Sequence, residues 1–485
     1  MSATRFLLAC AAALWRERTL SRQGITRLQH ARLARLVAHA AERVPMYRNL
    51  YAGIDPRNFE LTDLPPVDKQ FLMERFDDTV ANRAVNFQQV QAFGRDKTAV
   101  GQALGKDLLL AMTSGTTGRV GYFLTETKAF EYLRGTLFAR ILRHKLANPF
   151  EVLRFGPWRR YKMAFVTATG GHYVTYLLGL RPPLLARMMM DRHAFSILTP
   201  MAQLCEELNR FQPHYLHGYP TFLEALAHEK LQGRLEIAPE VISLGSEPVT
   251  AMARTTLLTA FPRAYVSETY GTTECVCIAT QCREGRLHVN EDVCILESVD
   301  AAGYPVPEGR PGTKVYITNL MAYAQPIIRY EIGDQVVINS EPCPCGFPFK
   351  TVKVLGRTDD TFYLRGEDNR FHAHTPIPFE ALFLEVEGLK QYQLVHEQQN
   401  QLRVTFTRES QVDAESVLRA LKDNFARYLA QHGLGNTVEV EFTEADEIPR
   451  DPMTKKIRQI ISRVPVPTNA DELSGPWRIK GLKQA

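Results

Sequence analysis

Short apolar runs alternate with helical segments between residues 165 and 271, and this alternation constrains the fold more than any other feature of the chain. The runs FVTAT, HYLHGY, VISLGS and AYVSETYG are separated by segments with apolar residues at helical spacing, at 200–210, 221–230 and 250–260. Strands that alternate with helices are typical of βαβ units, whose strands pair in parallel. The pattern therefore predicts an α/β fold built on a parallel sheet.

Segments on either side extend this prediction. Residues 26–48 predict an amphipathic helix closed by Val44-Pro45, and LLLAM at 108–112 begins a strand, a Gly-rich loop and then a helix. Beyond Gly271 the runs CIATQC, LHVNED, CILES, KVYITNL, IIRYEIGD and QVVIN predict a small antiparallel sheet or distorted barrel. From Thr358 a strand, a helix, paired strands, a long helix and a further strand predict a separate small α/β domain.

These patterns divide the chain into three parts. We expect a large N-terminal α/β domain at 1–357, with parallel sheets and a small antiparallel subdomain. We expect a small mobile C-terminal α/β domain at 358–465, followed by a polar, proline-containing tail at 466–485.

Charge and hydropathy exclude several classes of partner. Lysine and arginine number 58 against 53 acidic residues, without long runs of one sign, so a nucleic-acid partner is not predicted. No stretch approaches the roughly 18 apolar residues of a membrane span. RFLLACAAALW at the start lacks a convincing cleavage site for a signal peptide, so we expect an amphipathic surface helix, which in one interpretation rests on a membrane or partner.

A segment rich in glycine and hydroxyl groups follows LLLAM. Two glycines let the backbone turn so that several amides face one point, and Arg119 adds positive charge. An oligophosphate suits this arrangement, although a Ser/Thr/Gly surface turn is the alternative, and the segment does not match GxxxxGK[ST]. The predicted phosphate-binding residues are Thr113, Ser114, Gly115, Thr116, Thr117 and Gly118.

This segment, TSGTTG, resembles the phosphate loop of the adenylate-forming superfamily, which includes acyl-CoA synthetases, peptide-synthetase adenylation domains and luciferases. Three further segments match that family in its order: SETYGTTE at 267–274, IIRYEIGD at 327–334 and GRTDD at 356–360. The chain is similar to the phenylacetate-CoA ligase-like branch, including adenylate-forming proteins of the capsule-biosynthesis type. The resemblance implies ATP and Mg²⁺ as cofactors and a cytoplasmic location.

The resemblance also implies roles for residues of the matched segments. Tyr270 would stack against adenine, Thr273 would hydrogen-bond the α-phosphate and Glu274 would hold Mg²⁺, while Asp334 and Arg357 would bind the ribose hydroxyls. A packing role for Tyr270 and a surface ion pair for Asp334 or Arg357 are the alternatives. The implied nucleotide site also includes Gly245, Ser246 and Glu247 of SLGSEPV, together with Gly271 and Thr272.

A lysine of the small domain would neutralise charge as pyrophosphate leaves. EIPRDPMTKKIRQI occupies the family position of this lysine, but Thr454 stands where the family has glycine. Counting from Pro449 selects Lys455 and counting back from Ile457 selects Lys456, and a solvent-facing pair is the alternative. Asp359, the first residue of the Asp359-Asp360 pair, matches the family hinge, although a plain turn also fits.

Four metal-ligating residues have the spacing of a structural zinc site: Cys282 and His288 form C-x5-H, and Cys343 and Cys345 form a C-x-C-G turn. Buried thiols with a surface histidine are the alternative. Cys275 and Cys277 are expected in the core or the acyl pocket.

The predicted reaction is the ATP-dependent activation of a carboxylic acid, aryl or fatty acyl, to an acyl-adenylate, with transfer to the thiol of CoA or an acyl carrier protein. His172 and the segment 216–219 lie where the family builds its acyl pocket, and Gly366 lies on the strand that borders its pantetheine tunnel. The polar link EDNRFHAHTPIPFE places CoA as acceptor in doubt. Adenylylation of a hydroxyl group and a non-catalytic nucleotide-binding role are the alternatives, and the oligomeric state is left open.

Overall fold

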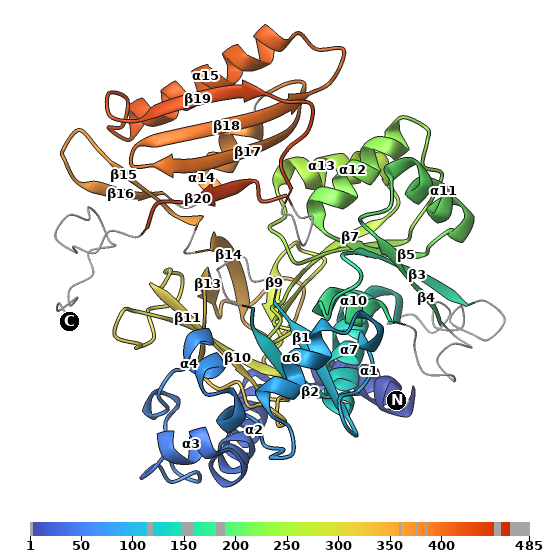
Figure 1. Cartoon of the computed structure of the whole chain (residues 1–485), viewed down its shortest axis with the longest axis vertical. Helices are drawn as coiled ribbons and strands as arrows, with labels where there is room; N and C mark the ends of the chain where they lie inside the picture. The colour runs from blue at the N-terminus through green and yellow to red at the C-terminus, as the bar shows by residue number, and fades with distance from the viewer. Residues whose placement is uncertain are drawn as a thin grey trace.

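The computed structural model describes residues 3–113, 120–146, 160–180, 190–357, 360–374, 376–384, 386–450 and 457–465. Figure 1 shows two bodies, one formed by the elements from α1 to β14 and a smaller one formed by the elements from β15 to β20. The predicted α/β class, with parallel strands, a small antiparallel sheet and a C-terminal α/β region, is confirmed. The limits 1–357 and 358–465 stay predictions.

A nine-stranded sheet of order β13-β14-β9-β8-β7-β6-β5-β3-β4 forms the centre of the large body. The five strands from β7 to β4 are parallel, and the others are antiparallel. The parallel strands are β3 (Tyr161–Thr167), β4 (Met190–Ser196), β5 (Tyr215–Gly218), β6 (Val241–Leu244) and β7 (Tyr265–Tyr270). The antiparallel strands are β8 (Ala279–Gln281), β9 (Leu287–Val289), β13 (Asp334–Asn339) and β14 (Thr351–Arg357).

Helices cover both faces of the parallel part of this sheet (Figure 1). On β3, Met163 and Phe165 pack with the helices α1 (Ala3–Thr19), α7 (Thr127–Ile141) and α10 (Val174–Gly179). The alternate residues Ala164 and Val166 pack with α11 (Met201–Phe211), α12 (Pro220–Leu231) and α13 (Ala251–Ala260). Burial on both faces explains why these strands are continuous apolar runs in the sequence.

The N-terminal helices differ in detail from the sequence prediction. The expected surface helix is α1, whose Phe6 and Ala13 are buried while Leu8 and Trp15 are exposed. The helix predicted over 26–48 is divided by Val44 into two. The other helices of this region are α2 (Arg22–Arg43), α3 (Pro45–Leu50), η1 (Leu61–Asp63), α4 (Lys69–Glu74), α5 (Phe76–Thr79), α6 (Phe87–Arg95) and η2 (Lys97–Ala99). The short helix α8 (Arg143–Leu146) follows α7.

The sequence predicted a strand, a loop and then a helix in this part of the chain. The structure has a two-stranded hairpin before α7. The strand β1 (Leu108–Met112) pairs antiparallel with β2 (Tyr122–Glu126), so the chain returns along β1 before α7 begins. The predicted phosphate-binding residues from Ser114 to Gly118 connect these strands and lie outside the described residues.

Two further sheets complete the fold. A small antiparallel sheet β10-β11-β12 is present after Gly271, with strands β10 (Cys294–Val299), β11 (Lys314–Asn319) and β12 (Tyr330–Ile332). The prediction was wrong for three of its six runs, because CIATQC, LHVNED and QVVIN form β8, β9 and β13 of the nine-stranded sheet. The C-terminal sheet has the order β19-β18-β17-β20, with its own apolar core drawn from residues between Phe362 and Ile460. The strands of this sheet and the two helices of the same body are α14 (Pro376–Leu384), β17 (Leu389–Gln398), β18 (Gln401–Arg408), α15 (Ala414–Gln431), β19 (Glu439–Glu444) and β20 (Ile460–Ser462).

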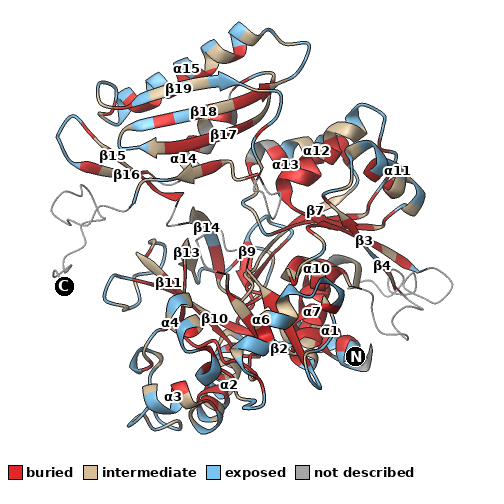
Figure 2. Cartoon of the chain, in the orientation of Figure 1, coloured by how far each residue is buried: buried red, intermediate tan, exposed pale blue. Residues whose placement is uncertain are grey.

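The polar segment after Gly366 is a strand rather than a loose link. β15 (Phe362–Arg365) pairs antiparallel with β16 (Phe371–His374), and Gly366 lies in the turn between them rather than on a strand. Figure 2 shows that buried residues line the sheets of both bodies, while the outer side of α15 is exposed. Among the described residues, no helix has the length and apolar character needed to cross a bilayer.

Candidate functional site

The predicted nucleotide residues gather at the carboxyl ends of β6 and β7, where α/β sheets commonly bind ligands. Gly245 follows β6, and a Cβ atom there would lie 2.8 Å from Thr269 Oγ1, so the two strand ends approach too closely for a side chain. Ser246 has a positive φ of 69°, and its hydroxyl lies 3.0 Å from Thr175 Oγ1. Glu247 accepts hydrogen bonds from the backbone N–H and hydroxyl of Thr221 at the start of α12.

Tyr270 and Asp334 are joined directly although 64 residues separate them in the chain. The Tyr270 hydroxyl donates to Asp334 Oδ2 at 2.6 Å. Burial, reinforced by the neighbouring carboxylate, raises the pKa of Tyr270 well above its ordinary value, so the phenol keeps its proton as a donor. Asp334 is also the β-ladder partner of Arg357, whose side chain lies outside the described part of the structure.

A tight turn after β7 positions Glu274. Thr272 N–H donates to the Cys275 carbonyl at 3.0 Å, and Cys275 N–H donates to Thr272 Oγ1 at 3.2 Å. A Cβ atom at Gly271 would lie 2.4 Å from the carbonyl oxygen of Val276, so this position requires glycine. Thr273 lies in the same turn and is half-buried.

The Glu274 carboxylate is held from the facing strand. Glu274 Oε1 accepts a hydrogen bond from the Tyr330 hydroxyl at 2.9 Å, and its backbone carbonyl accepts one from Asn319 Nδ2 at 2.9 Å. Burial raises the pKa of Glu274, while hydrogen bonds from its own backbone N–H, Tyr330 and Thr272 and the positive charge of Lys69 act in the opposite direction. A partly desolvated carboxylate of this kind favours a nearby cation.

Lys69 is a candidate site residue that the sequence analysis missed. It begins α4, and its Cε lies 3.3 Å from the Cβ position of Gly121 at the start of the returning strand. Beside it, Thr113 Oγ1 accepts from Gly121 N–H at 2.7 Å and closes the hairpin. Lys69 therefore lies between Glu274 and the ends of the segment 114–119. No periodic pattern around Pro65-Pro66 marks this lysine, so only its three-dimensional position identifies it.

Several predicted residues cannot be placed. The members of the phosphate segment from Ser114 to Gly118, the hinge residue Asp359 and both candidate lysines, Lys455 and Lys456, lie outside the described residues. Asp360 is described; it is buried and forms an ion pair with Arg458, which follows the two lysines.

The two histidines near the expected acyl pocket are packed side chains. His172 is buried, and its ring lies 5.3 Å from that of Phe93 on α6. His217 Nδ1 lies 3.1 Å from Ser243 Oγ, and its ring contacts Phe165. Burial lowers the pKa of both, to about 4 for His217, so both are neutral at physiological pH. The packing alternative is therefore favoured for His172.

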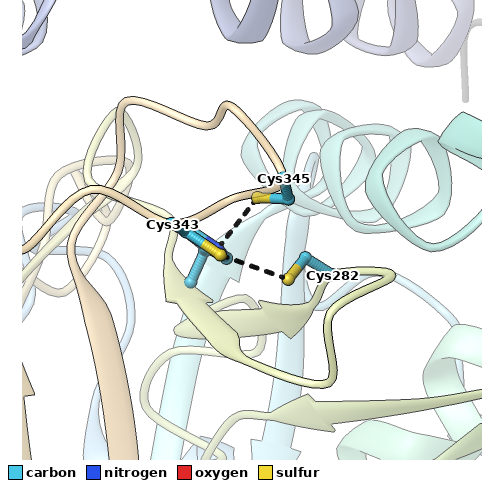
Figure 3. A group of neighbouring side chains, drawn as sticks. Cys282, Cys343 and Cys345 are labelled. Carbon is cyan, nitrogen blue, oxygen red and sulfur yellow. Dashed lines mark hydrogen bonds between the residues drawn. The ribbon is translucent and has the colours of Figure 1, made fainter.

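Three thiols and one imidazole converge where the loops after β8 and β13 meet β9. Figure 3 shows the three cysteines of this group. The ligand atoms of Cys282, His288, Cys343 and Cys345 all lie within 4.8 Å of one another. Cys282 Sγ is 3.8 Å from Cys343 Sγ, and Cys345 Sγ is 3.3 Å from His288 Nε2. Sulfurs bound at about 2.3 Å to one tetrahedral zinc ion lie about 3.8 Å apart, so the arrangement fits zinc. His288 Nδ1 donates to the Phe349 carbonyl at 2.9 Å, which orients the ring.

Cys275 and Cys277 are core residues, one of the two positions expected for them. Both are buried, and Cys277 Sγ accepts a hydrogen bond from Asn290 Nδ2 at 3.1 Å. Burial raises the pKa of the Cys277 thiol. Both residues therefore act as packing groups, and the Cys277 thiol is neutral.

The α/β fold thus places a turn with a desolvated carboxylate beside the Tyr270–Asp334 pair at a strand end. Comparison with known proteins identifies the class to which the chain belongs. Residues 26–321, more than half of the chain, match the family profile described as AMP-binding enzyme, so the chain belongs to this family. The predicted membership of the adenylate-forming superfamily and of its phenylacetate-CoA ligase-like branch is confirmed, as is the prediction of an adenylate-forming ligase.

Named relatives agree with this assignment. The chain is 29% identical to phenylacetate-coenzyme A ligase of Thermus thermophilus over 474 residues, covering 89% of this chain and 95% of the relative. It is 27% identical to the Escherichia coli enzyme of the same name over 371 residues, covering 72% of this chain and 74% of the relative. It is 24% identical to protein CapK of Staphylococcus aureus over 256 residues, 52% of this chain and 53% of CapK.

Solved structures show the same fold. 2-Hydroxyisobutyryl-CoA ligase in the postadenylation state, in complex with R3-HIB-AMP, superposes with a TM-score of 0.70 at 19% identity, covering 92% of this chain and 91% of that one. The same ligase in the thioesterification state covers the same shares with a TM-score of 0.55.

Proposed function

We propose that this chain activates a carboxylic acid with ATP to an acyl-adenylate and pyrophosphate, and then transfers the acyl group to a thiol. The observation that carries the proposal is the joint position of Tyr270, Glu274 and Asp334 at the carboxyl ends of the parallel strands. The membership of the AMP-binding family and the named CoA-ligase relatives support it.

The nucleotide would lie along the edge formed by β6 and β7. Tyr270 offers an aromatic face for adenine, and Asp334 accepts hydrogen bonds that suit a ribose hydroxyl pair, opposite Arg357. Gly245 has no side chain, so a flat base would approach the backbone beside the loop that carries Ser246 and Glu247. Thr113 and the segment 114–118 would bind the oligophosphate.

Glu274 would hold the Mg²⁺ that accompanies ATP. Its carboxylate is desolvated, and the Tyr330 hydroxyl fixes one of its oxygens. A hard divalent cation compensates such a carboxylate and the phosphates together. Thr273 in the same turn would donate to the α-phosphate, and Lys69 would neutralise charge as pyrophosphate leaves.

The small domain would supply the lysine that bridges the acid and the α-phosphate. Lys455 and Lys456 are both candidates, and the Asp360–Arg458 ion pair anchors the chain just beyond them. Domain alternation about Asp359 would then bring the acceptor thiol to the acyl-adenylate. We propose CoA as acceptor, because the named relatives are CoA ligases and the polar segment after Gly366 forms an ordered hairpin. An acyl carrier protein would present the same thiol.

We also propose a structural zinc ion at Cys282, His288, Cys343 and Cys345. The distances between their ligand atoms fit a tetrahedral site with no open position. The ion would fasten the loop that carries Cys343 and Cys345 to the strands β8 and β9, next to the turn that holds Glu274.

A pyrophosphate-release screen over aryl, fatty and amino acids tests this function. We expect release that requires both ATP and one class of carboxylic acid, and formation of the thioester when CoA is added. Release that needs an alcohol and no acid would instead indicate adenylylation of a hydroxyl group. No release with any acid, although the protein binds ATP, would contradict the proposal.

A further inference from the structure

Two buried arginines and one buried carboxylate influence one another in the core of the large body. Arg134 on α7 and Arg192 on β4 are 4% and 3% exposed, and Glu131 is 1% exposed. Arg134 Nη2 contacts both oxygens of Glu131 at 2.6 Å. Arg192 donates only to the weak acceptor Met190 Sδ, at 3.7 Å, among the described residues. Because a guanidinium stays charged in proteins, this cluster carries one uncompensated positive charge.

Three N–H groups of the two arginines have no hydrogen-bond partner among the described residues. Arg192 Nε, Arg192 Nη1 and Arg134 Nε are fully buried and have no hydrogen-bond partner within the described part of the chain. The Arg192 guanidinium lies 5.1 Å from the ring of Phe6, which gives a face contact but accepts no strong hydrogen bond. Buried donors of this kind are almost always satisfied, by protein, water or an ion.

The neighbouring groups do not supply the missing negative charge. Arg134, Glu131, Cys10 and Tyr215 are the groups that act most strongly on Arg192. Burial raises the pKa of the Cys10 thiol to about 12 and also raises the pKa of Tyr215, so both are neutral. The Cys10 thiol also donates to the Gly135 carbonyl at 3.2 Å.

We propose that Arg134 and Arg192 form a buried binding site for one carboxylate or small oxyanion. An anion there would neutralise the excess charge and accept from the three unused donors. The site lies on the sheet face that also carries the proposed nucleotide edge: the Tyr215 and His217 rings stack with centroids 6.4 Å apart, and His217 Cε1 is 3.5 Å from the Cβ position of Gly245. The anion has two sources, a free ion or the far carboxylate of the acid that the enzyme activates.

Thermal unfolding of the full chain in formate tests the site. Formate is the probe because phosphate would also bind the proposed phosphate segment, and HEPES balances the ionic strength. We expect the midpoint of thermal unfolding to rise by roughly 1–2 °C when formate exceeds its Kd about tenfold. Arg192→Met should abolish the rise. The control Arg283→Met, at an exposed arginine, should respond as the wild type. A flat wild-type response, or the same rise in Arg192→Met, would overturn the proposal.

A second measurement needs no variant and so does not depend on how Arg192→Met folds. Crystals of the wild-type chain soaked in bromide should show an anomalous peak within hydrogen-bond distance of Arg192 Nη1 and Arg134 Nε. A map with bromide at surface sites and none here would contradict a buried anion site.

Substrate preference distinguishes the two sources of the anion. This part of the test rests on the proposed function. Pyrophosphate release is compared for α,ω-dicarboxylic acids and monocarboxylic acids of equal length. A preference for one dicarboxylic acid that Arg192→Met removes assigns the site to the substrate. Equal rates together with a formate response assign it to a free ion. The unfolding and bromide measurements stand even if no acid is activated.

Discussion

Arg140 is a buried cation that joins three distant parts of the chain, and its replacement by methionine tests the packing beneath the site. Arg140 Nε donates to Glu17 Oε1 on α1 at 2.8 Å, and Nη2 donates to Asp292 Oδ1 at 2.7 Å. All three side chains are at most 4% exposed. The guanidinium also lies 4.8 Å from the ring of Phe349, which follows the cysteine loop.

Methionine fills a similar volume but leaves two buried carboxylates without their main partner. Removing one member of a buried ion pair costs about 3–5 kcal/mol. Asp292 keeps Arg16 at 3.2 Å, whereas burial already raises the pKa of Glu17 even with Arg140 present. We therefore expect Arg140→Met to lower the free energy of unfolding by an amount within this range, mainly because Glu17 is left without its partner.

The sign of the pH dependence follows from the same argument. A buried carboxyl whose pKa is raised in the folded state destabilises the fold as pH rises through that pKa. The loss caused by Arg140→Met should therefore be larger at pH 8 than at pH 5.5, and the additional change Glu17→Gln should recover part of it.

Urea unfolding followed by circular dichroism at the two pH values measures the effect. The control Arg283→Met removes an exposed arginine and should change the free energy of unfolding by less than about 0.5 kcal/mol. A loss below about 1 kcal/mol at pH 8, or an equal loss at both pH values, would refute the assignment of Arg140 as the compensating charge.

Four other predictions address the site itself. Glu274→Gln keeps an acceptor for Tyr330 but removes the negative charge, so the rate of pyrophosphate release should fall about 100-fold or more. Calorimetry should show an unfolding temperature no lower than that of the wild type, because burial raises the pKa of Glu274 and thus disfavours its charged form. Gly271→Ala should weaken ATP binding in a titration, because its Cβ meets the Val276 carbonyl at 2.4 Å, whereas Gly435→Ala, with contacts of 3.6 Å or more, should not. Cys343→Ser should lose the zinc that elemental analysis detects in the wild type and in Cys205→Ser; a zinc-free wild type would refute this claim. Replacing Lys455 and Lys456 together by alanine should lower adenylation by about two to three orders of magnitude and leave thiol transfer from a supplied acyl-adenylate largely intact.

The alternation of strands and helices was predictable because both faces of the parallel strands are buried, which makes each strand a continuous apolar run. The strand β2 was missed because YFLTE is short and runs directly into α7, so its apolar residues merged with the helical pattern. The strand β16 was missed because FHAH is polar and follows a turn at Gly366. The spacing of apolar residues does not predict a short strand that forms only by pairing across a hairpin.

Residues of the site were predictable where a motif keeps them together. Glu274 and Gly271 belong to one segment, SETYGTTE, and the structure places them in one turn. The bond between Tyr270 and Asp334 joins segments 64 residues apart. The family resemblance implied that both residues bind the nucleotide but did not predict this bond. Lys69 and the Arg134–Arg192 pair belong to no motif. Lys69 approaches Gly121 from another element, and Arg134 and Arg192 come from α7 and β4, so only the folded chain brings these groups together.

The most direct test of the account is a crystal structure of the chain with Mg²⁺ and a non-hydrolysable ATP analogue. We expect adenine on the Tyr270 ring, the ribose at Asp334, Mg²⁺ within coordination distance of Glu274, and the phosphates beside Thr113 and Lys69. A nucleotide bound elsewhere, or bound here with Glu274 and Asp334 both remote from it, would contradict the central claim.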